Sequence, residues 1–136
     1  MEINKFYIAG KFITPDGKEI IDLINPATEE KVGNVISGSE KDVNDAVGAA
    51  KQAFKDASAL SLEQKKTILQ EIIDGMDKKR EQFAQVISEE MGAPIKVARG
   101  AQFSSGKVHF VNTLKVIDSF SFSEVHDNIT LNKLPI

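Results

Sequence analysis

The stretch that decides the fold is Ile24-Asn25-Pro26-Ala27-Thr28-Glu29-Glu30-Lys31-Val32, because it joins two strand-forming segments through a tight polar turn. The run from Glu19 to Ile24 is rich in β-branched and apolar residues, which favours a strand. Asn25-Pro26 ends that strand, since proline has no N–H to donate to a neighbouring strand. We expect the next short strand from Val32 to Ile36. The stretch therefore predicts a strand–turn–strand unit.

Two further turn signals precede this unit. Ala9-Gly10 separates Phe6-Tyr7-Ile8 from Phe12-Ile13, and glycine can supply the positive φ of a tight hairpin turn. Pro15-Asp16-Gly17 is the second signal, because proline presets φ and the two residues after it suit the remaining turn positions. We therefore expect residues 1–38 to consist of strands and turns.

Residues 39–118 are expected to be helical, because apolar residues recur there at steps of three and four. Ser39 can cap the first helix, and Asp42 suits the positive end of its dipole. Ser61 with Gln64 has the form of a capping box for the second helix. The apolar stripes are Val43, Ala46, Val47, Ala50, Phe54 and Ala57 in the first helix, Ile68, Leu69, Ile72, Ile73 and Met76 in the second, and Phe83, Val86, Ile87 and Met91 in the third.

Glycine and proline mark helix boundaries near the end of the helical region. Gly92 stands where a left-handed residue is needed to end the third helix. Pro94 suits the first turn of a fourth helix, where its missing N–H is harmless. Gly100 and Gly106 weaken that helix by about 1 kcal/mol each relative to alanine.

Residues 119–136 predict a return to strand. The polar turn His126-Asp127-Asn128 lies between Phe120, Phe122 and Val125 on one side and the alternating run Ile129 to Leu134 on the other. An isolated hairpin is marginal in water, so this one needs another sheet, another subunit or further chain as a neighbour. The abrupt apolar end at Pro135-Ile136 leads us to expect a truncated piece of a larger protein.

Composition excludes several classes of function. With 136 residues, 41% hydrophobic and 27% charged, the chain is typical of one soluble globular domain. Its net charge of −3 gives no electrostatic reason to expect nucleic acid or an anionic membrane as a partner. No apolar stretch approaches the roughly 20 residues that cross a bilayer. We therefore expect a cytoplasmic location. The chain has no cysteine, which excludes disulfides, thiolate metal sites and a cysteine nucleophile.

The motifs that indicate phosphate, zinc or dinucleotide sites in other proteins are incomplete or absent in this sequence. Gly100 to Lys107 differs from a phosphate-binding P-loop, because five residues separate its glycines and Val108 replaces the magnesium-binding hydroxyl. His109 and His126 are distant from each other and lack the spacing of a zinc site. No Gly-x-Gly-x-x-Gly follows a strand. The residues alone therefore predict a soluble α/β piece in which no catalytic or cofactor-binding residue can be assigned.

Five segments in order resemble the amino-terminal region of the aldehyde dehydrogenase superfamily. Together the five segments span essentially all of the chain, and their order and spacing make the resemblance specific. Ala93 and Met91 depart from the Lys and Thr that are common in the family signature Glu-x-Gly-Lys-Pro. The segments are Phe6 to Phe12, Ile24 to Val32, Ser39 to Phe54, Glu89-Glu90-Met91-Gly92-Ala93-Pro94, and Leu134-Pro135-Ile136.

The resemblance implies an α/β fold made of β-hairpins, antiparallel-packed helices and a terminal oligomerisation hairpin. Residues 1–118 would be the N-terminal part of the cofactor-binding domain, and residues 119–136 the start of the hairpin that pairs subunits of a homo-oligomer. The family oxidises aldehydes to carboxylic acids with NAD or NADP, using a cysteine thiolate, a glutamate base and an asparagine amide. All of these would lie beyond Ile136, so we expect this chain alone to bind no cofactor.

The resemblance also implies one possible metal site. Some members of the family bind a monovalent cation through backbone carbonyls and an acidic side chain, at positions that match Leu23, Ile24 and Glu90. Oxygen ligands suit such a hard cation. The alternative is that Glu90 is a solvated glutamate at a helix C-terminus with no ion.

Three hypotheses for function follow. The leading one is an N-terminal segment of an NAD(P)-dependent aldehyde dehydrogenase, inactive by itself. The second is a non-enzymatic remnant that associates with full-length homologous subunits through its final hairpin. The third is a product that does not fold stably, because its apolar stripes lack the sheet that would cover them.

Overall fold

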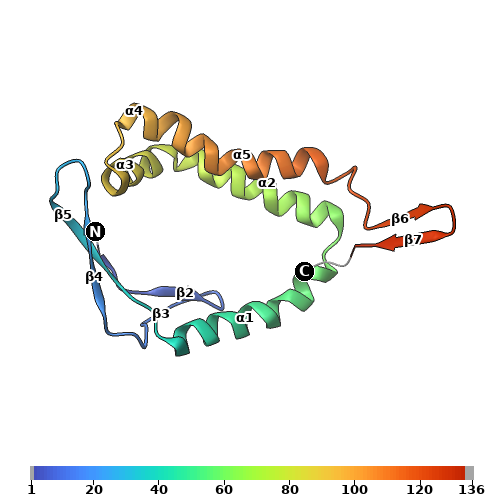
Figure 1. Cartoon of the computed structure of the whole chain (residues 1–136), viewed down its shortest axis with the longest axis horizontal. Coiled ribbons are helices and arrows are strands. Elements are labelled where there is room, and N and C mark those ends of the chain that lie inside the picture. The colour runs from blue at the N-terminus through green and yellow to red at the C-terminus, as the bar shows by residue number, and fades with distance from the viewer. Residues whose placement is uncertain (1, 134–136) are drawn as a thin grey trace.

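The N-terminal hairpin forms where it was predicted. The structure is a computed structural model that describes residues 2–133, and Figure 1 shows a mixed α/β chain. Strand β2 (Phe6–Ile8) pairs antiparallel with β3 (Lys11–Ile13). Ala9 and Gly10 both have positive φ, at 51° and 77°, which matches the twist of the two strands. The sequence had indicated positive φ only for the glycine.

The strand–turn–strand unit also forms as predicted. Strand β4 (Ile20–Ile24) pairs antiparallel with β5 (Lys31–Ile36). Strand β1 (Glu2–Ile3) adds in parallel to the other edge of β5, which gives the order β1-β5-β4. The sequence did not predict β1, because a strand of two residues shows no periodicity.

Each of the first three helices has the start or the end that the sequence indicated. Ser39 with Asp42, and Ser61 with Gln64, form complete capping boxes in which side chain and backbone N–H bond reciprocally. The third helix ends at Gly92, whose φ of 64° is left-handed. These helices are α1 (Glu40–Ala59), α2 (Leu62–Lys78) and α3 (Arg80–Met91).

The fourth helical stretch differs from the prediction. Pro94 is not in the first turn but precedes it: its ψ of 134° is extended, and its carbonyl accepts the N–H groups of Val97 and Ala98. The stretch is α4 (Ile95–Val97), a π-helical turn η1 (Ala98–Gln102) and α5 (Phe103–Val116). A π turn follows no apolar repeat, so residue periodicity could not predict it.

The C-terminal hairpin is confirmed with a shorter turn. Strand β6 (Ser123–His126) pairs antiparallel with β7 (Ile129–Asn132), and His126 faces Ile129 across the ladder. The turn is therefore the two residues Asp127-Asn128, not three, and Asp127 has a φ of 51°. Phe120 and Phe122 precede the strand and stack edge to face. The predictions for Leu134, Pro135 and Ile136 lie outside the described residues.

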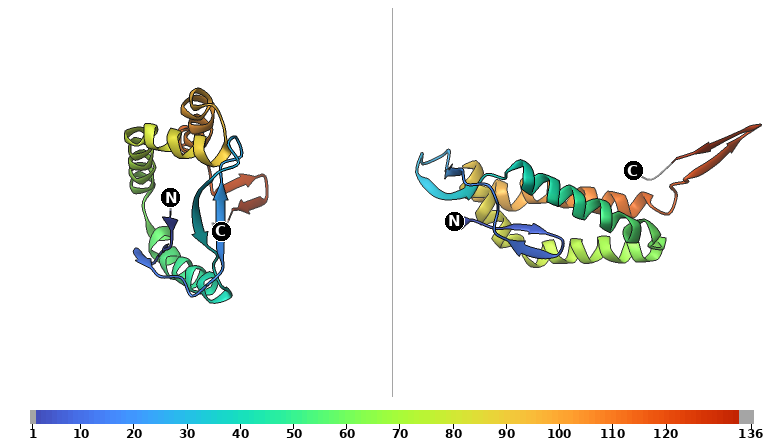
Figure 2. Two further views of the ribbon diagram at one scale, coloured as in Figure 1. Left: turned by 90° about the vertical axis from the view of Figure 1, so that its left-hand side faces the viewer. Right: turned by 90° about the horizontal axis from the view of Figure 1, so that it is seen from below.

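The elements enclose an open ring. Helices α2 and α5 run antiparallel as one layer, α1 crosses the opposite side, and β4 and β5 close one end (Figure 1). Hairpin β6–β7 projects away from the other end, as the right-hand view of Figure 2 also shows. Antiparallel helix packing was predicted and is present between α2 and α5, whereas α1 contacts β2.

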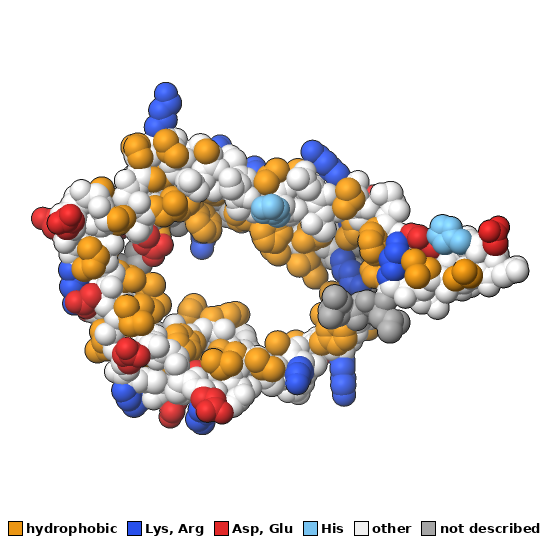
Figure 3. Space-filling view, in the orientation of Figure 1, with side chains coloured by type: hydrophobic (Ala, Val, Ile, Leu, Met, Phe, Trp, Pro, Cys, Tyr) orange, Lys and Arg blue, Asp and Glu red, His pale blue; other side chains and the backbone are white. Residues whose placement is uncertain are grey.

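The buried core is small for a chain of this length. The buried apolar residues lie where α2, α3, η1 and α5 meet, and most large apolar residues elsewhere are exposed. Figure 3 shows apolar side chains gathered around the central opening. Among residues 2–133, no helix is long and apolar enough to cross a bilayer. The buried apolar residues are Ile73, Ala84, Ala98 and Phe103.

Candidate functional site

The turn after β4 is built by its own polar groups. The Asn25 side chain accepts a hydrogen bond from the Ala27 N–H at 2.9 Å, and its backbone N–H donates to the Glu30 carbonyl at 2.9 Å. Thr28 accepts from the Glu30 N–H, and Glu29 has a φ of 60°. Asparagine and threonine are common in turns because their side chains reach back to the nearby backbone. This explains locally why the stretch folds as it does.

Gly92, which comes much later in the sequence, packs against this turn. A Cβ added to Gly92 would stand 2.9 Å from the Ala27 nitrogen and 3.0 Å from the Pro26 ring. The Ser88 hydroxyl donates to the Ala93 carbonyl at 2.7 Å, which fixes the chain just after the glycine. Two segments of the family resemblance thus meet at one corner of the molecule.

The three residues of the predicted cation site flank the two segments of this corner in the sequence. Leu23 and Ile24 are the last residues of β4, where the register with β5 shifts, and Glu90 lies two residues before Gly92. Glu90 is exposed and Leu23 is half-buried. Because the turn packs on Gly92, the fold brings both chain segments to the same place. Occupation by a cation stays a prediction.

Asp42 is the one charged side chain that is buried among the described residues, with 4% of its surface exposed. Its carboxylate accepts the N–H groups of Asp16 at 2.9 Å, Gly17 at 3.0 Å and Ser39 at 2.8 Å, and the Ser39 hydroxyl at 3.0 Å. These bonds, the one from the Asp16 N–H first, hold the pKa of Asp42 well below its ordinary value of 3.8. The carboxylate therefore ties the loop after β3 to the start of α1.

Sequence reasoning missed the reach of Asp42. It placed Asp42 at the positive end of a helix but did not connect it with the Pro15-Asp16-Gly17 turn. A Cβ on Gly17 would stand 2.0 Å from the Ser37 carbonyl oxygen, so the loop can close on α1 only with glycine at this position. That glycine was the only available signal.

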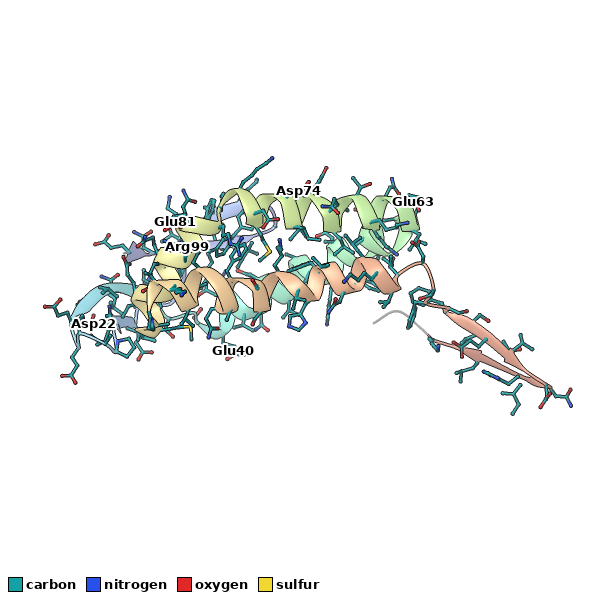
Figure 4. All side chains as sticks on the ribbon, turned by 90° about the horizontal axis from the view of Figure 1, so that it is seen from above. Asp22, Glu40, Glu63, Asp74, Glu81 and Arg99 are labelled. Carbon is teal, nitrogen blue, oxygen red and sulfur yellow. The ribbon has the colours of Figure 1, made fainter. Side chains whose placement is uncertain are left out.

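A second charged cluster joins α3 to the π-helical turn. Arg99 donates two hydrogen bonds to the Glu81 carboxylate, both at 2.7 Å, and Figure 4 shows the two side chains together. They lower the pKa of Glu81 to about 2. The Arg80 guanidinium lies 5.1 Å from the centre of the buried Phe103 ring. All three charged groups are exposed, and their hydrogen bonds go to one another or to the backbone. We therefore interpret the cluster as a structural contact.

The remaining polar groups form no catalytic arrangement. His109 and His126 are exposed, as the sequence indicated, and His126 lies 3.5 Å from Glu124 on its own hairpin. Lys107 pairs with Asp77 at 2.8 Å inside a helical stretch, so Gly100 to Lys107 does not form a phosphate-binding loop. Within residues 2–133, no three His, Cys, Asp or Glu side chains stand where they could hold a metal ion.

Two grooves on the surface of residues 2–133 also lack a catalytic arrangement. A groove of about 470 Å³ between α2 and α5 contains Lys66, but that ammonium is already bound to Asp118 at 2.9 Å and Glu63 at 3.1 Å. A groove of about 310 Å³ between α1 and the β2–β3 hairpin is lined mostly by alanines. Neither offers a nucleophile with a neighbouring base, which acyl or hydride chemistry would require.

Comparison with known proteins identifies the protein family that shares this architecture. The sequence pattern of the aldehyde dehydrogenase family matches residues 12–129, which is most of the chain. The chain belongs to the aldehyde dehydrogenase family. The family resemblance read from the sequence is therefore confirmed.

Individual relatives agree with this assignment. A crystal structure of aldehyde dehydrogenase from Bartonella henselae superposes with a TM-score of 0.88 at 34% identity, covering 94% of this chain and 27% of that one. A structure of aldehyde dehydrogenase C from Pseudomonas syringae, a variant in complex with NAD+ and octanal, superposes with a TM-score of 0.86 at 37% identity, over 90% of this chain and 25% of that one. A Staphylococcus epidermidis protein that carries the aldehyde dehydrogenase name is 35% identical over 121 residues.

These matches confirm the fold class and limit what this chain supplies. It spans about a quarter of the length of the relatives that it matches: 26% of the Staphylococcus epidermidis protein and 27% of the Bartonella henselae chain. The 136 residues contain no cysteine. The activity of the relatives is therefore a separate question from the family of this chain.

Proposed function

We propose that this chain is the N-terminal structural segment of an NAD(P)-dependent aldehyde dehydrogenase and is inactive in isolation. The observation that supports this most directly is a family fold with no cysteine in any of its 136 residues. Oxidation of an aldehyde by this family's route needs a thiolate, an oxyanion donor and a base. Here the polar residues serve turns, caps and helix pairs instead.

NAD is the cofactor that we propose for the complete enzyme, with NADP as the alternative. The support is the Pseudomonas syringae relative, whose structure contains NAD+ with octanal. We propose no binding of either nucleotide by residues 1–136 alone. A cytoplasmic location stays our expectation.

The cation site at Leu23, Ile24 and Glu90 belongs to this proposal. Its support is the convergence of the β4 end and the α3 end at the turn that packs on Gly92. Titration with K⁺ or Na⁺ of the wild-type chain and of Glu90→Gln, followed by thermal melting, tests it. A cation-dependent rise in Tm is expected only for the wild type, since binding to the folded state alone stabilises it. Equal responses from both chains would contradict the site.

The test of the main proposal is a chimera. Residues 1–136 replace the matching quarter of the Bartonella henselae enzyme, and the product is assayed with an aldehyde and either NAD+ or NADP+. We expect aldehyde-dependent formation of reduced nicotinamide by the chimera and none by purified 1–136. Turnover by the isolated chain would refute the proposal, and so would a well-folded chimera without activity when the unmodified enzyme is active.

A second proposal rests on the C-terminal hairpin, in which Val125, Ile129 and Leu131 are 72%, 68% and 48% exposed. A projecting two-stranded hairpin with uncovered apolar residues favours addition to a partner. In this alternative the chain is a non-enzymatic remnant that joins full-length homologous subunits, as one member of a family homo-oligomer. We expect co-purification with an intact homologue, lost when Leu131 and Leu134 become aspartate. A chain that stays strictly monomeric beside the homologue rules this alternative out.

A further inference from the structure

The sequence contains two Asp-Gly pairs, Asp16-Gly17 and Asp74-Gly75. Aspartate rearranges to isoaspartate most readily before glycine, because glycine has no side chain to shield its nitrogen and leaves the backbone free to turn. In isoaspartate the main chain continues through the side-chain carboxyl. Whether such a pair reacts in a folded protein therefore depends on how the fold holds the glycine nitrogen.

The rearrangement needs no reagent other than water. The glycine nitrogen attacks Cγ of the protonated aspartate carboxyl, so that an N–Cγ bond forms and a C–O bond breaks. The N–H proton and the carboxyl hydroxyl leave as one water. The cyclic succinimide then takes up one water, which breaks the bond between its nitrogen and the carbonyl next to Cα. The chain is now joined through Cγ, Cα carries a free carboxylate, and the mass is unchanged.

Asp16-Gly17 lies in the loop after β3, where one buried side chain holds both of its N–H groups. The Gly17 N–H donates to Asp42 Oδ2 at 3.0 Å, and the Asp16 N–H donates to Asp42 Oδ1 at 2.9 Å. The Ser39 hydroxyl lies 3.3 Å from the Asp16 carboxylate. Because the pKa of Asp42 is held well below its ordinary value, its carboxylate binds the Gly17 proton and is a poor base for removing it.

The space around Gly17 also opposes ring closure. A Cβ added to Gly17 would stand 2.0 Å from the Ser37 carbonyl oxygen and 3.0 Å from the Ser39 nitrogen. Gly17 is therefore packed on the backbone that leads into α1. Ring closure moves the Gly17 nitrogen toward Asp16 Cγ, which draws its N–H away from Asp42. An isoaspartate adds one main-chain atom, about 1.5 Å of bond length, and the packed loop has no room for it.

The second pair is held in a different way. Asp74-Gly75 lies inside α2, where Figure 4 labels Asp74. The Gly75 N–H belongs to the regular hydrogen-bond ladder of the helix. The Asp74 carboxylate accepts a hydrogen bond from Gln70 Nε2 at 2.8 Å. Closure of this pair therefore depends on the helix as a whole, and it serves as a reference within the same chain.

We propose that Asp16-Gly17 is a latent site of isoaspartate formation, that Asp42 and Ser39 keep it closed, and that rearrangement there releases the loop after β3 from the start of α1. The proposal concerns the 136-residue chain itself and does not depend on the activity of the complete enzyme. The Gly17 nitrogen reacts only in molecules whose loop has opened locally, so the rate follows the population of the open loop.

The test compares the wild-type chain with Asp42→Asn, both incubated at neutral pH below their melting transitions. An isoaspartyl methyltransferase measures total isoaspartate, and tandem mass spectrometry with electron-transfer fragmentation locates it. A peptide of residues 12–22 gives the unprotected rate. We expect the folded wild type to react at Asp16 at least about tenfold more slowly than the peptide. Asp42→Asn should raise the rate about tenfold, because an amide replaces one carboxylate oxygen and the charge is lost.

Asp45→Asn is the matched control, because it removes a carboxylate from an exposed position in the same helix. It should leave the rate at Asp16 unchanged. Asp16→Glu should abolish the signal at this position, since closure would need a six-membered ring. Ser39→Ala keeps the Asp42 carboxylate and should raise the rate by a smaller factor, so it replaces Asp42→Asn if that variant does not fold. Circular dichroism shows which variants are folded.

Several results would overturn the proposal. A folded wild type that reacts as fast as the peptide would show that the loop gives no protection. An unchanged rate in folded Asp42→Asn would show that Asp42 does not close the site, and a slower rate would show that it acts as a base. An equal rise at Asp74 would indicate general unfolding instead of local release. Rearranged wild-type chain that keeps the Tm of the unmodified chain would refute the release of the loop.

Discussion

Two regions of the molecule have apolar residues at helical spacing but differ in burial. One is the junction where α3, η1 and α5 meet, and the other is helix α1. At the junction Ala84 and Ala98 are fully buried and Phe103 is 2% exposed, with the Phe83 ring 5.9 Å away. In α1 the comparable aromatic, Phe54, is 44% exposed. Both regions have apolar side chains at helical spacing, but within residues 2–133 the junction buries its aromatic ring almost completely and α1 does not. The contrast teaches that an apolar stripe predicts a partner without saying where the partner is.

The largest effect that tests this contrast is expected at the two phenylalanines. Phe103→Ala should lower the free energy of unfolding by about 3–5 kcal/mol, because it removes a buried ring and leaves a cavity. Phe54→Ala should lower it by only about 1 kcal/mol, since a side chain that is 44% exposed loses less buried apolar surface on truncation. Chemical denaturation followed by circular dichroism measures both. Similar losses would show that α1 is covered after all.

The same denaturation curves, recorded on the wild-type chain, decide whether the chain folds alone. A cooperative transition is expected, carried by the junction and by the α2–α5 layer. Absence of any cooperative transition would instead favour a product that does not fold stably, since its apolar stripes are uncovered.

Next in size are two glycines with positive φ. Gly92→Ala should cost about 2–3 kcal/mol, because a left-handed alanine is strained and its Cβ would press on the Asn25–Thr28 turn. At Gly10 nothing lies within 4 Å of an added Cβ, so Gly10→Ala should cost only about 1 kcal/mol. Denaturation midpoints of the two variants give the comparison. Equal costs would show that Gly92 does not hold the turn against α3.

Asp42 gives a smaller effect that depends on pH. Its pKa is lower in the folded chain than the ordinary 3.8, so its stabilisation is complete above that value and is lost as the pH falls further. Asp42→Asn should lower Tm at pH 7, and the gap between variant and wild type should narrow below about pH 4. Asp45→Asn, at an exposed position in the same helix, is the control. A gap that is constant with pH would contradict the role of the carboxylate as an anchor for α1.

The smallest effect is expected at the start of α2. Ser61→Ala removes the side chain that accepts the Gln64 N–H and should cost about 1 kcal/mol. Ser58→Ala, near the end of α1, removes only a bond to the Lys55 carbonyl and should be nearly neutral. Thermal melts at neutral pH compare the two. Loss of equal size in both would mean that the cap contributes nothing beyond a surface hydroxyl.

Local chemistry made much of the fold predictable. Asn25-Pro26 could only end a strand, Ser61 with Gln64 could satisfy the free N–H groups of a helix start, and Gly92 could adopt a φ that other residues avoid. Each of these depends on a few neighbouring residues, so the sequence contains all the required information. The prediction for Pro94 was wrong by one residue because proline is tolerated both in the first turn and just before it.

The long-range contacts were not predictable in this way. The pairing of Arg99 with Glu81 depends on how α3 and the π-helical turn approach each other. The hydrogen bonds from Asp16 and Gly17 to Asp42 join groups more than twenty residues apart. Periodicity places such side chains on a face of a helix but does not say which other face they meet.

By itself the sequence determined the family, the order of the longer strands and helices, the caps of α1 and α2 and the lack of a cysteine nucleophile, because each follows from residue types and their spacing. Only the tertiary structure decided that Ile73 and Phe103 are buried while Val47 and Phe54 are not, and that Asp42 anchors a distant loop. The physical reason is that burial and hydrogen bonding belong to pairs of surfaces. One chain segment carries only half of each pair.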